Sequence, residues 1–102
     1  MDGKIVRIAE LEIDPAQLDA YSALLADEIA ASVATEPGVL MLHAVAERAR
    51  PEQIRILEVY ADRTAYEAHL TTPHFLKYKL GTAGMVRALR LVDVDPVMMR
   101  SK

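Results

Sequence analysis

The sequence predicts an α+β fold, a ferredoxin-like βαββαβ arrangement with helices on one face of a four-stranded antiparallel sheet. Two observations carry this prediction: helical crossovers alternate with four strand-like segments, and the middle two strands are joined by a short polar loop. No repeat, low-complexity run or linker divides the chain, so residues 1–102 are interpreted as a single domain.

The first half of the chain reads as a strand followed by a long helix. Residues 5–13 mix two-residue alternation with β-branched side chains, which indicates a strand. Asp14 and Pro15 then predict a helix start, because Asp caps free amides and Pro suits the first helical position. The helix runs to about residue 34 and ends at Glu36-Pro37-Gly38. Its expected apolar stripe is Leu18, Tyr21, Leu25, Ile29 and Val33, and its expected off-stripe residues are Asp19, Asp27 and Glu28.

The next two strands are expected to pair as a hairpin. Residues 39–48 and 54–59 flank the loop 49–52, and pairing about that loop places residues opposite each other when their numbers sum to about 101. On this register His43 faces Glu58 on one side of the sheet.

The second crossover contains two short helices. Asp62 is the expected N-cap of the first, which carries His69. Thr72 and Pro73 start the second, and residues 86–94 then predict the fourth strand.

Composition limits the partners and the location of the chain. The 102 residues carry a net charge of −3 without a basic cluster, so we expect no nucleic-acid partner. No apolar run approaches the roughly 20 residues of a membrane helix, and the N-terminus lacks the features of a signal peptide. The absence of cysteine excludes disulfides and thiolate chemistry. We therefore expect a cytoplasmic protein with no membrane partner.

The apolar content predicts self-association. Hydrophobic residues make up 52% of the chain, both faces of the middle strands are largely apolar, and the tail at residues 96–99 is apolar as well. An uncovered apolar sheet face is an aggregation hazard in a monomer. We therefore expect a homodimer that buries sheet against sheet.

Glu58, His69 and His43 are the candidate catalytic residues. A Glu within an apolar strand is costly to bury unless it is paired, and a desolvated carboxylate can serve as a general base. His69 could orient it or donate to a substrate oxygen, and His43 could pair with it on the predicted register. The alternative for each is structural: a Glu–His contact that joins elements, or a packed histidine.

Four further residues are candidates for substrate binding: Tyr60, His74, Tyr21 and Phe75. Tyrosines could flank an aromatic substrate, although such residues also commonly belong to the core. His74 follows Pro73 in the first turn of a helix, where it could line a pocket entrance or have a purely structural role. Phe75 is more typical of a core residue.

We expect no metal and no other cofactor. His and Glu are ligands of open non-haem iron centres, but His69 and His74 are five residues apart, whereas residues that share a helix face are three or four apart. No HExxH-type motif or glycine-rich phosphate loop is present.

Several segments in this spacing resemble the antibiotic biosynthesis monooxygenase family, which includes small quinol monooxygenases. They are Glu36-Pro37-Gly38, Glu58-Val59-Tyr60-Ala61-Asp62, Ala65-Tyr66-Glu67-Ala68-His69-Leu70 and Thr72-Pro73-His74-Phe75. The resemblance implies a dimeric α+β barrel with a pocket between the sheet and helices of each subunit. It also implies oxidation of phenolic or quinol substrates by molecular oxygen without metal or flavin.

The sequence departs from some branches of that family. It contains neither Trp nor Asn, and Tyr60 stands where relatives often have Trp. Haem-degrading relatives use an Asn, a Trp and a His together, so we do not expect that activity.

The first functional hypothesis is a cofactor-independent monooxygenase for a small phenolic, quinol or polyketide-like substrate. The alternatives are an acid–base isomerase or degrading enzyme for a small carbonyl compound, and a non-catalytic dimeric module that binds a small molecule.

Overall fold

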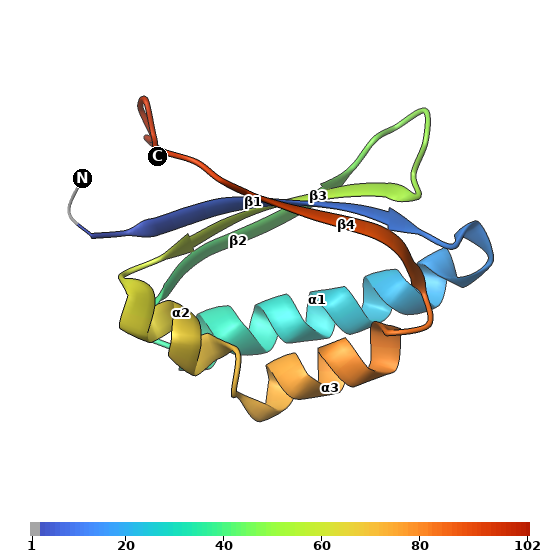
Figure 1. The fold of residues 1–102 in the computed structure, drawn as a ribbon, viewed down its shortest axis with the longest axis horizontal. Coiled ribbons are helices and arrows are strands. Elements are labelled where there is room, and N and C mark those ends of the chain that lie inside the picture. The colour runs from blue at the N-terminus through green and yellow to red at the C-terminus, as the bar shows by residue number, and fades with distance from the viewer. Residues whose placement is uncertain (1–2) are drawn as a thin grey trace.

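The computed structural model describes residues 3–102 and confirms the α+β ferredoxin-like βαββαβ fold. The sheet is antiparallel with strand order β2-β3-β1-β4, and the helices all lie on one side of it (Figure 1). Within the described residues no helix has the length and apolar character needed to span a membrane. The elements in chain order are β1 (Ile5–Ile13), a 3-10 turn (Pro15–Gln17), α1 (Leu18–Thr35), β2 (Val39–Ala46), β3 (Gln53–Tyr60), α2 (Arg63–His69), α3 (Pro73–Thr82) and β4 (Val86–Asp93).

Capping side chains fix where α2 and α3 begin. The Asp62 carboxylate accepts a hydrogen bond from the Ala65 N–H at 2.7 Å. The Thr72 hydroxyl accepts one from the Phe75 N–H at 3.3 Å, and Pro73 occupies the first position of α3. Each cap satisfies an amide that the first helical turn leaves free. The two helices therefore start at the residues that the sequence predicts.

The core lies between α1 and the face of the sheet that the helices cover, here called the inner face. Its main cluster comprises Ala9, Leu11, Ile13, Tyr21, Leu25, Ile54 and Ile56. A smaller cluster of Val39, Leu42 and Tyr60 lies where β2 and β3 meet. Together they anchor β3, the strand that carries Glu58.

The register of the β2–β3 hairpin differs by one residue from the sequence prediction. Leu42, not His43, lies opposite Glu58, and His43 lies opposite Leu57. Because successive side chains of a strand alternate between faces, Glu58 is on the inner face and His43 on the outer face, where it is exposed. The predicted pairing of His43 with Glu58 is therefore wrong.

The loop geometry explains this difference. The Glu47 N–H donates to the Gln53 carbonyl at 3.0 Å, and the Gln53 N–H donates to the Arg50 carbonyl at 2.9 Å. These bonds set the register of the hairpin. The sequence does not predict that register, because the loop lacks the two-residue turn motifs that fix one. A further irregularity between Val39 and Met41 shifts the pairing again near the start of β2.

The outer face is only partly covered within the chain. Val6 and Val59 are buried there, beside a hollow that residues 96–99 also line. Leu40 and Val45 of β2 are exposed, as are Val97 and Met98 of the tail. This face retains the apolar character that the sequence predicts.

Candidate functional site

A cavity of about 580 Å³ lies between the inner face of the sheet and the helices. Most of its wall is apolar, and its volume is in the range of pockets that hold small ligands. Several ionisable or hydroxyl-bearing side chains interrupt that wall: Arg7, Glu28, Glu58, Tyr60, Tyr66, His69, Tyr78, Lys79 and Thr82. A largely apolar chamber with polar groups in its wall suits a small aromatic ligand with a small number of oxygens.

Glu58 is the carboxylate that β3 supplies to the cavity wall. The Tyr60 hydroxyl donates a hydrogen bond to Glu58 Oε1 at 2.8 Å. Burial raises the pKa of Glu58 above its ordinary value, although the Tyr60 bond and the charge of Arg7 act in the opposite direction. Glu58 is therefore a better proton acceptor than an ordinary surface carboxylate.

Arg7 lies on the inner face of β1, opposite Glu58 in the β1–β3 register. Its Nη1 donates to the Tyr66 hydroxyl at 2.5 Å, and its Nε donates to Asp93 Oδ1 at 3.0 Å. The guanidinium also lies 4.6 Å from the centre of the Tyr66 ring. These contacts keep a positive charge at the wall that Glu58 shares.

Tyr21 contributes to the site only indirectly. Its hydroxyl lies 2.6 Å from the Tyr78 hydroxyl, and the rings meet edge to face at 5.9 Å. Tyr78 lines the cavity, whereas Tyr21 is fully buried and does not. Burial raises the pKa of both phenols, so both stay protonated at neutral pH.

His69, at the end of α2, is buried in the cavity wall. Its ring centre lies 4.9 Å from that of Phe75 and 5.3 Å from that of Tyr60. Both neighbours also line the cavity. The imidazole is therefore fixed by packing as well as by its polar contacts.

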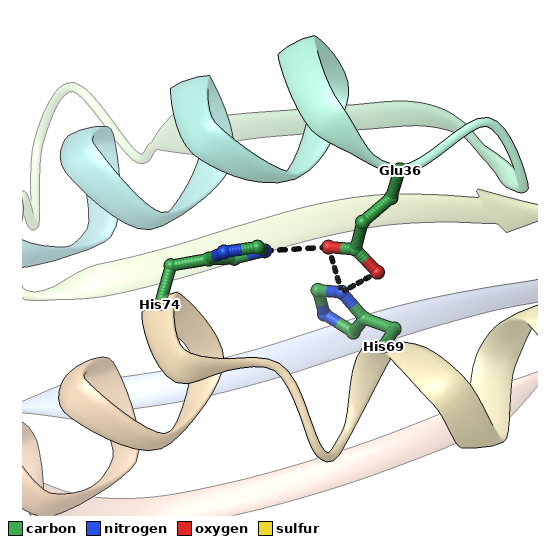
Figure 2. A group of neighbouring side chains, drawn as sticks. All are labelled: Glu36, His69 and His74. Atoms are coloured by element: carbon green, nitrogen blue, oxygen red, sulfur yellow. Dashed lines mark hydrogen bonds and ion pairs between the residues drawn. The ribbon is translucent and has the colours of Figure 1, made fainter.

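His69, His74 and Glu36 form a second group of polar side chains, the Glu36 cluster. His69 Nδ1 lies 3.0 Å from Glu36 Oε2, and His74 Nε2 lies 2.6 Å from the same oxygen. Figure 2 shows the carboxylate between the two imidazole rings. Burial would raise the pKa of Glu36, but the contacts with His74 and His69 outweigh it, and the pKa lies below its ordinary value. Glu36 is therefore an anion at neutral pH.

Glu28 approaches His69 from the other side of the imidazole. Its Oε1 lies 3.3 Å from His69 Nε2, and it also accepts a hydrogen bond from the Ser32 hydroxyl at 2.9 Å. Burial raises the pKa of Glu28, while the Ser32 bond and the charge of His69 oppose that shift. One imidazole thus has a carboxylate at each of its ring nitrogens.

Leu18, Tyr21, Leu25 and Ile29 of the expected stripe do belong to the core, but Glu28 is buried beside them, because the inward face shifts by one residue in the second half of α1. The buried residues of α1 are Tyr21, Leu25, Glu28 and Ser32, while Val33 is 51% exposed. The expectation that Glu28 falls off the stripe is wrong. The inward face of α1 becomes polar toward the end of the helix. Its polar residues there are spaced four apart: Glu28, Ser32 and Glu36.

Gly38 brings Glu36 close to α2. A Cβ at Gly38 would lie 2.4 Å from the Ala65 Cβ, closer than side-chain carbons approach. The Ala61 N–H also donates to the Gly38 carbonyl at 2.8 Å. The turn after α1 therefore packs directly on the start of α2, which positions Glu36 beside His69.

The structure brings together most of the candidate residues. Glu58, Tyr60, His69 and Phe75 line one cavity, and His74 joins the Glu36 cluster beside it. His43 lies on the outer face, and Tyr21 lies outside the cavity lining.

Sequence reasoning missed several residues of this region: Arg7, Glu28, Glu36, Tyr66 and Tyr78. Arg7 could have been found from its place between Ile5 and Ala9, two inward-facing positions of β1. An arginine at such a position needs nearby partners.

The argument that spacing keeps His69 and His74 apart is also wrong. The two residues do not share a helix, since His69 ends α2 and His74 lies in the first turn of α3. The turn at residues 70–72 brings the second imidazole back toward the first, so that both reach Glu36.

Comparison with known proteins gives a consistent result. Residues 4–79 match the family model described as antibiotic biosynthesis monooxygenase. No curated protein matches the chain.

Solved structures match over nearly the whole chain. A protein from Bacteroides thetaiotaomicron whose name assigns it to the same family is 48% identical, with a TM-score of 0.97 over 98% of this chain and 97% of that one. A protein from Lactobacillus acidophilus named as a monooxygenase is 26% identical, with a TM-score of 0.87, but this chain covers only 51% of its length. A Caulobacter crescentus structure at 24% identity, with a TM-score of 0.87 over 95% and 92% of the two chains, shows the same fold. None of these names states a substrate.

Proposed function

The chain belongs to the antibiotic biosynthesis monooxygenase family, and we propose that it oxidises a small phenolic, quinol or polyketide-like substrate with molecular oxygen in a reaction that needs no cofactor. The observation that carries this proposal is Glu58, a carboxylate of raised pKa in the wall of a largely apolar cavity. Such a group accepts a phenolic proton at neutral pH better than a solvated carboxylate does.

In the proposed reaction Glu58 removes the proton from a substrate hydroxyl. The resulting anion is electron-rich and transfers electrons to oxygen, and a carbon–oxygen bond forms at a ring carbon. When a CH₂ carbon is oxidised to a carbonyl, one atom of O₂ enters the product and the other leaves as water. The substrate supplies the four electrons that reduce O₂. The protein contributes an apolar chamber and proton transfer.

The neighbours of Glu58 have roles that follow from their positions. The Tyr60 hydroxyl fixes one carboxylate oxygen, and Arg7 provides a positive charge that would stabilise a substrate anion. His69 and Phe75 line the same cavity and would flank an aromatic ring.

Oxygen uptake with a panel of quinols and hydroxylated polycyclic ketones tests this proposal. We expect uptake with at least one compound, and a loss of about 100-fold or more in kcat/KM for Glu58→Gln. Glu67→Gln is the matched control, because Glu67 is an exposed glutamate of α2, away from the proposed dimer face. Uptake by Glu58→Gln at the rate of the unmodified protein would contradict the role of Glu58. Turnover of a carbonyl compound without oxygen uptake would favour the isomerase alternative.

We also propose that the chain forms a homodimer through the outer face. The support is the exposed apolar surface of β2 and of the tail, which includes Val45, Val97 and Met98. Sedimentation equilibrium at micromolar concentration should give twice the mass of the chain. A folded monomer under those conditions contradicts this assembly.

A further inference from the structure

We propose that Glu36, His69 and His74 form a binding site for a first-row divalent metal ion, which fastens the α2–α3 segment to the end of α1. The three ligands come from the C-cap of α1, the last residue of α2 and the first turn of α3 (Figure 2). The site goes beyond the proposed oxidation and does not depend on it.

The ligand atoms already converge. One donor atom of each residue lies within 4.8 Å of the donors of the other two. Zinc holds imidazole nitrogens and carboxylate oxygens at about 2.0–2.2 Å, so two ligands of one ion lie no more than about 4.4 Å apart. Glu36 Oε2 lies at hydrogen-bond distance from both imidazoles, 3.0 Å from His69 Nδ1 and 2.6 Å from His74 Nε2. These side chains would move apart by less than about 1 Å to admit an ion between them.

A second observation concerns the nitrogen of His69 that would not bind the metal. A histidine that ligates a metal usually donates its other N–H to a carboxylate, which fixes the tautomer and the ring orientation. His69 Nε2 lies 3.3 Å from Glu28 Oε1, and the Ser32 hydroxyl holds that same oxygen at 2.9 Å. The arrangement of metal ligand and outer carboxylate is therefore present in the buried part of the cluster.

His69 faces a carboxylate at both ring nitrogens. With a metal ion bound at Nδ1, the remaining N–H of His69 can donate to Glu28.

The chemistry of the ligands indicates which ions fit. Two imidazoles and one carboxylate suit zinc, cobalt, nickel or iron, whereas magnesium and calcium prefer sets made of oxygen ligands. The side chains of Glu36 and His74 are 13% and 21% exposed, so an ion can reach them from solvent. His69 is buried and would hold the ion against the core, with the buried Glu28 at its other nitrogen.

Zinc titration of chelator-treated protein, followed by calorimetry and thermal unfolding, tests the site. We expect one ion per chain and a rise of several degrees in the unfolding midpoint at saturating zinc, since a ligand that binds only the folded state stabilises it. Magnesium at the same concentration should change neither quantity. Absence of zinc binding by the folded protein would overturn the proposal.

Substitutions locate the site. His74→Ala and Glu36→Gln alter the two partly exposed ligands and should each weaken zinc binding by at least about tenfold, and Glu28→Gln should weaken it by about 10–100-fold through the outer contact. His43→Ala is the matched control and should bind zinc as the unmodified protein does. Unchanged affinity in both ligand variants, or a loss in the His43 variant, would overturn the assignment.

Cobalt provides a measurement that does not depend on stability. Cobalt bound by this set should give visible absorption bands that are lost in His74→Ala protein whose circular dichroism shows an intact fold. Bands that persist in that variant would contradict the site. Oxygen uptake by the chelated protein tests the proposed oxidation separately, so the two proposals fail independently.

Discussion

Glu58 and Glu36 are both largely shielded carboxylates, yet their neighbours give them opposite properties. Burial favours the neutral form of each, but Glu58 has a neutral hydroxyl as its close partner, and its pKa is raised. Glu36 has two imidazoles, and its pKa is lowered. Burial therefore sets a baseline, and the partner decides the sign of the shift. The first carboxylate is suited to accepting a proton, and the second to remaining an anion that holds protons or a cation.

The backbone that carries the two carboxylates also differs. Glu58 lies within β3, a strand with a neighbour on each side. Glu36 is the C-cap of α1, and its position depends on a turn that packs against α2 through Gly38. Changes to the helices should therefore affect Glu36 far more than Glu58.

The largest expected effect on stability comes from His69→Ala, which removes an imidazole partner of Glu36. Removing the imidazole leaves Glu28 and Glu36 without their shared partner in a buried region. Loss of one partner from a buried ion pair costs about 3–5 kcal/mol. Urea unfolding in the presence of chelator should show a loss of this size, with Glu67→Ala, at an exposed position of α2, within about 0.5 kcal/mol of the unmodified protein. A loss below about 1 kcal/mol would mean that His69 is not the link between these elements.

Gly38→Ala should have the next largest effect on stability, because it displaces the turn that positions Glu36. The new Cβ would overlap the Ala65 Cβ, and overpacking of this kind costs about 1–3 kcal/mol. The matched control is Gly84→Ala, since nothing lies within 4 Å of a Cβ there. In a double-mutant cycle, Ala65→Gly should recover part of the loss, because it removes the atom that the new methyl group meets. Two independent, additive losses would show that the close contact does not control this turn.

The fold could be predicted because its signals are local. Strand β1 was predicted at its observed bounds, residues 5–13, and the caps at Asp62 and Thr72 mark the starts of α2 and α3 where the structure has them. Asp14 caps a 3-10 turn instead, and α1 begins at Leu18, later than predicted. The hairpin register could not be predicted, because it depends on loop hydrogen bonds that reach from Glu47 to Gln53. Because the predicted register is wrong by one residue, the prediction placed His43 on the same face as Glu58, whereas it lies on the opposite face.

The candidate site was predicted only in part, for a similar reason. Glu58 stands out in sequence because a carboxylate is unexpected in an apolar strand. Glu28 and Glu36 do not stand out, because glutamates on and after a helix are common and usually solvated. Their importance arises from the meeting of α1 with the α2–α3 turn, a contact between residues more than 30 positions apart. Spacing along the chain carries no information about such a contact.

The smallest expected effect on stability, from Glu58→Gln, tests the properties of Glu58 through its pH dependence. Four groups face Glu58 from the elements around it: Tyr60 of β3, Arg7 of β1, His69 of α2 and Glu28 of α1. Because the folded-state pKa of Glu58 lies above the unfolded value, the folded chain binds more protons in the window between them. The contribution of Glu58 to the stability of the unmodified protein therefore falls as the pH rises from about 4.5 through that window. Gln does not titrate and still offers an oxygen to the Tyr60 hydroxyl.

Glu58→Gln should accordingly match the unmodified protein at pH 4 and exceed it by about 1 kcal/mol at pH 8, a gain typical of replacing a strained functional group. Urea unfolding at pH 4, 6 and 8 measures this difference, with Glu67→Gln as the control, because Glu67 is an exposed glutamate of α2. A loss of stability that grows with pH would mean that ionised Glu58 stabilises the fold. In that case the carboxylate would be a structural partner of Arg7 and Tyr60. A gain that grows with pH would show that the fold bears a cost to keep this carboxylate in the cavity, as expected for a group retained for its chemistry.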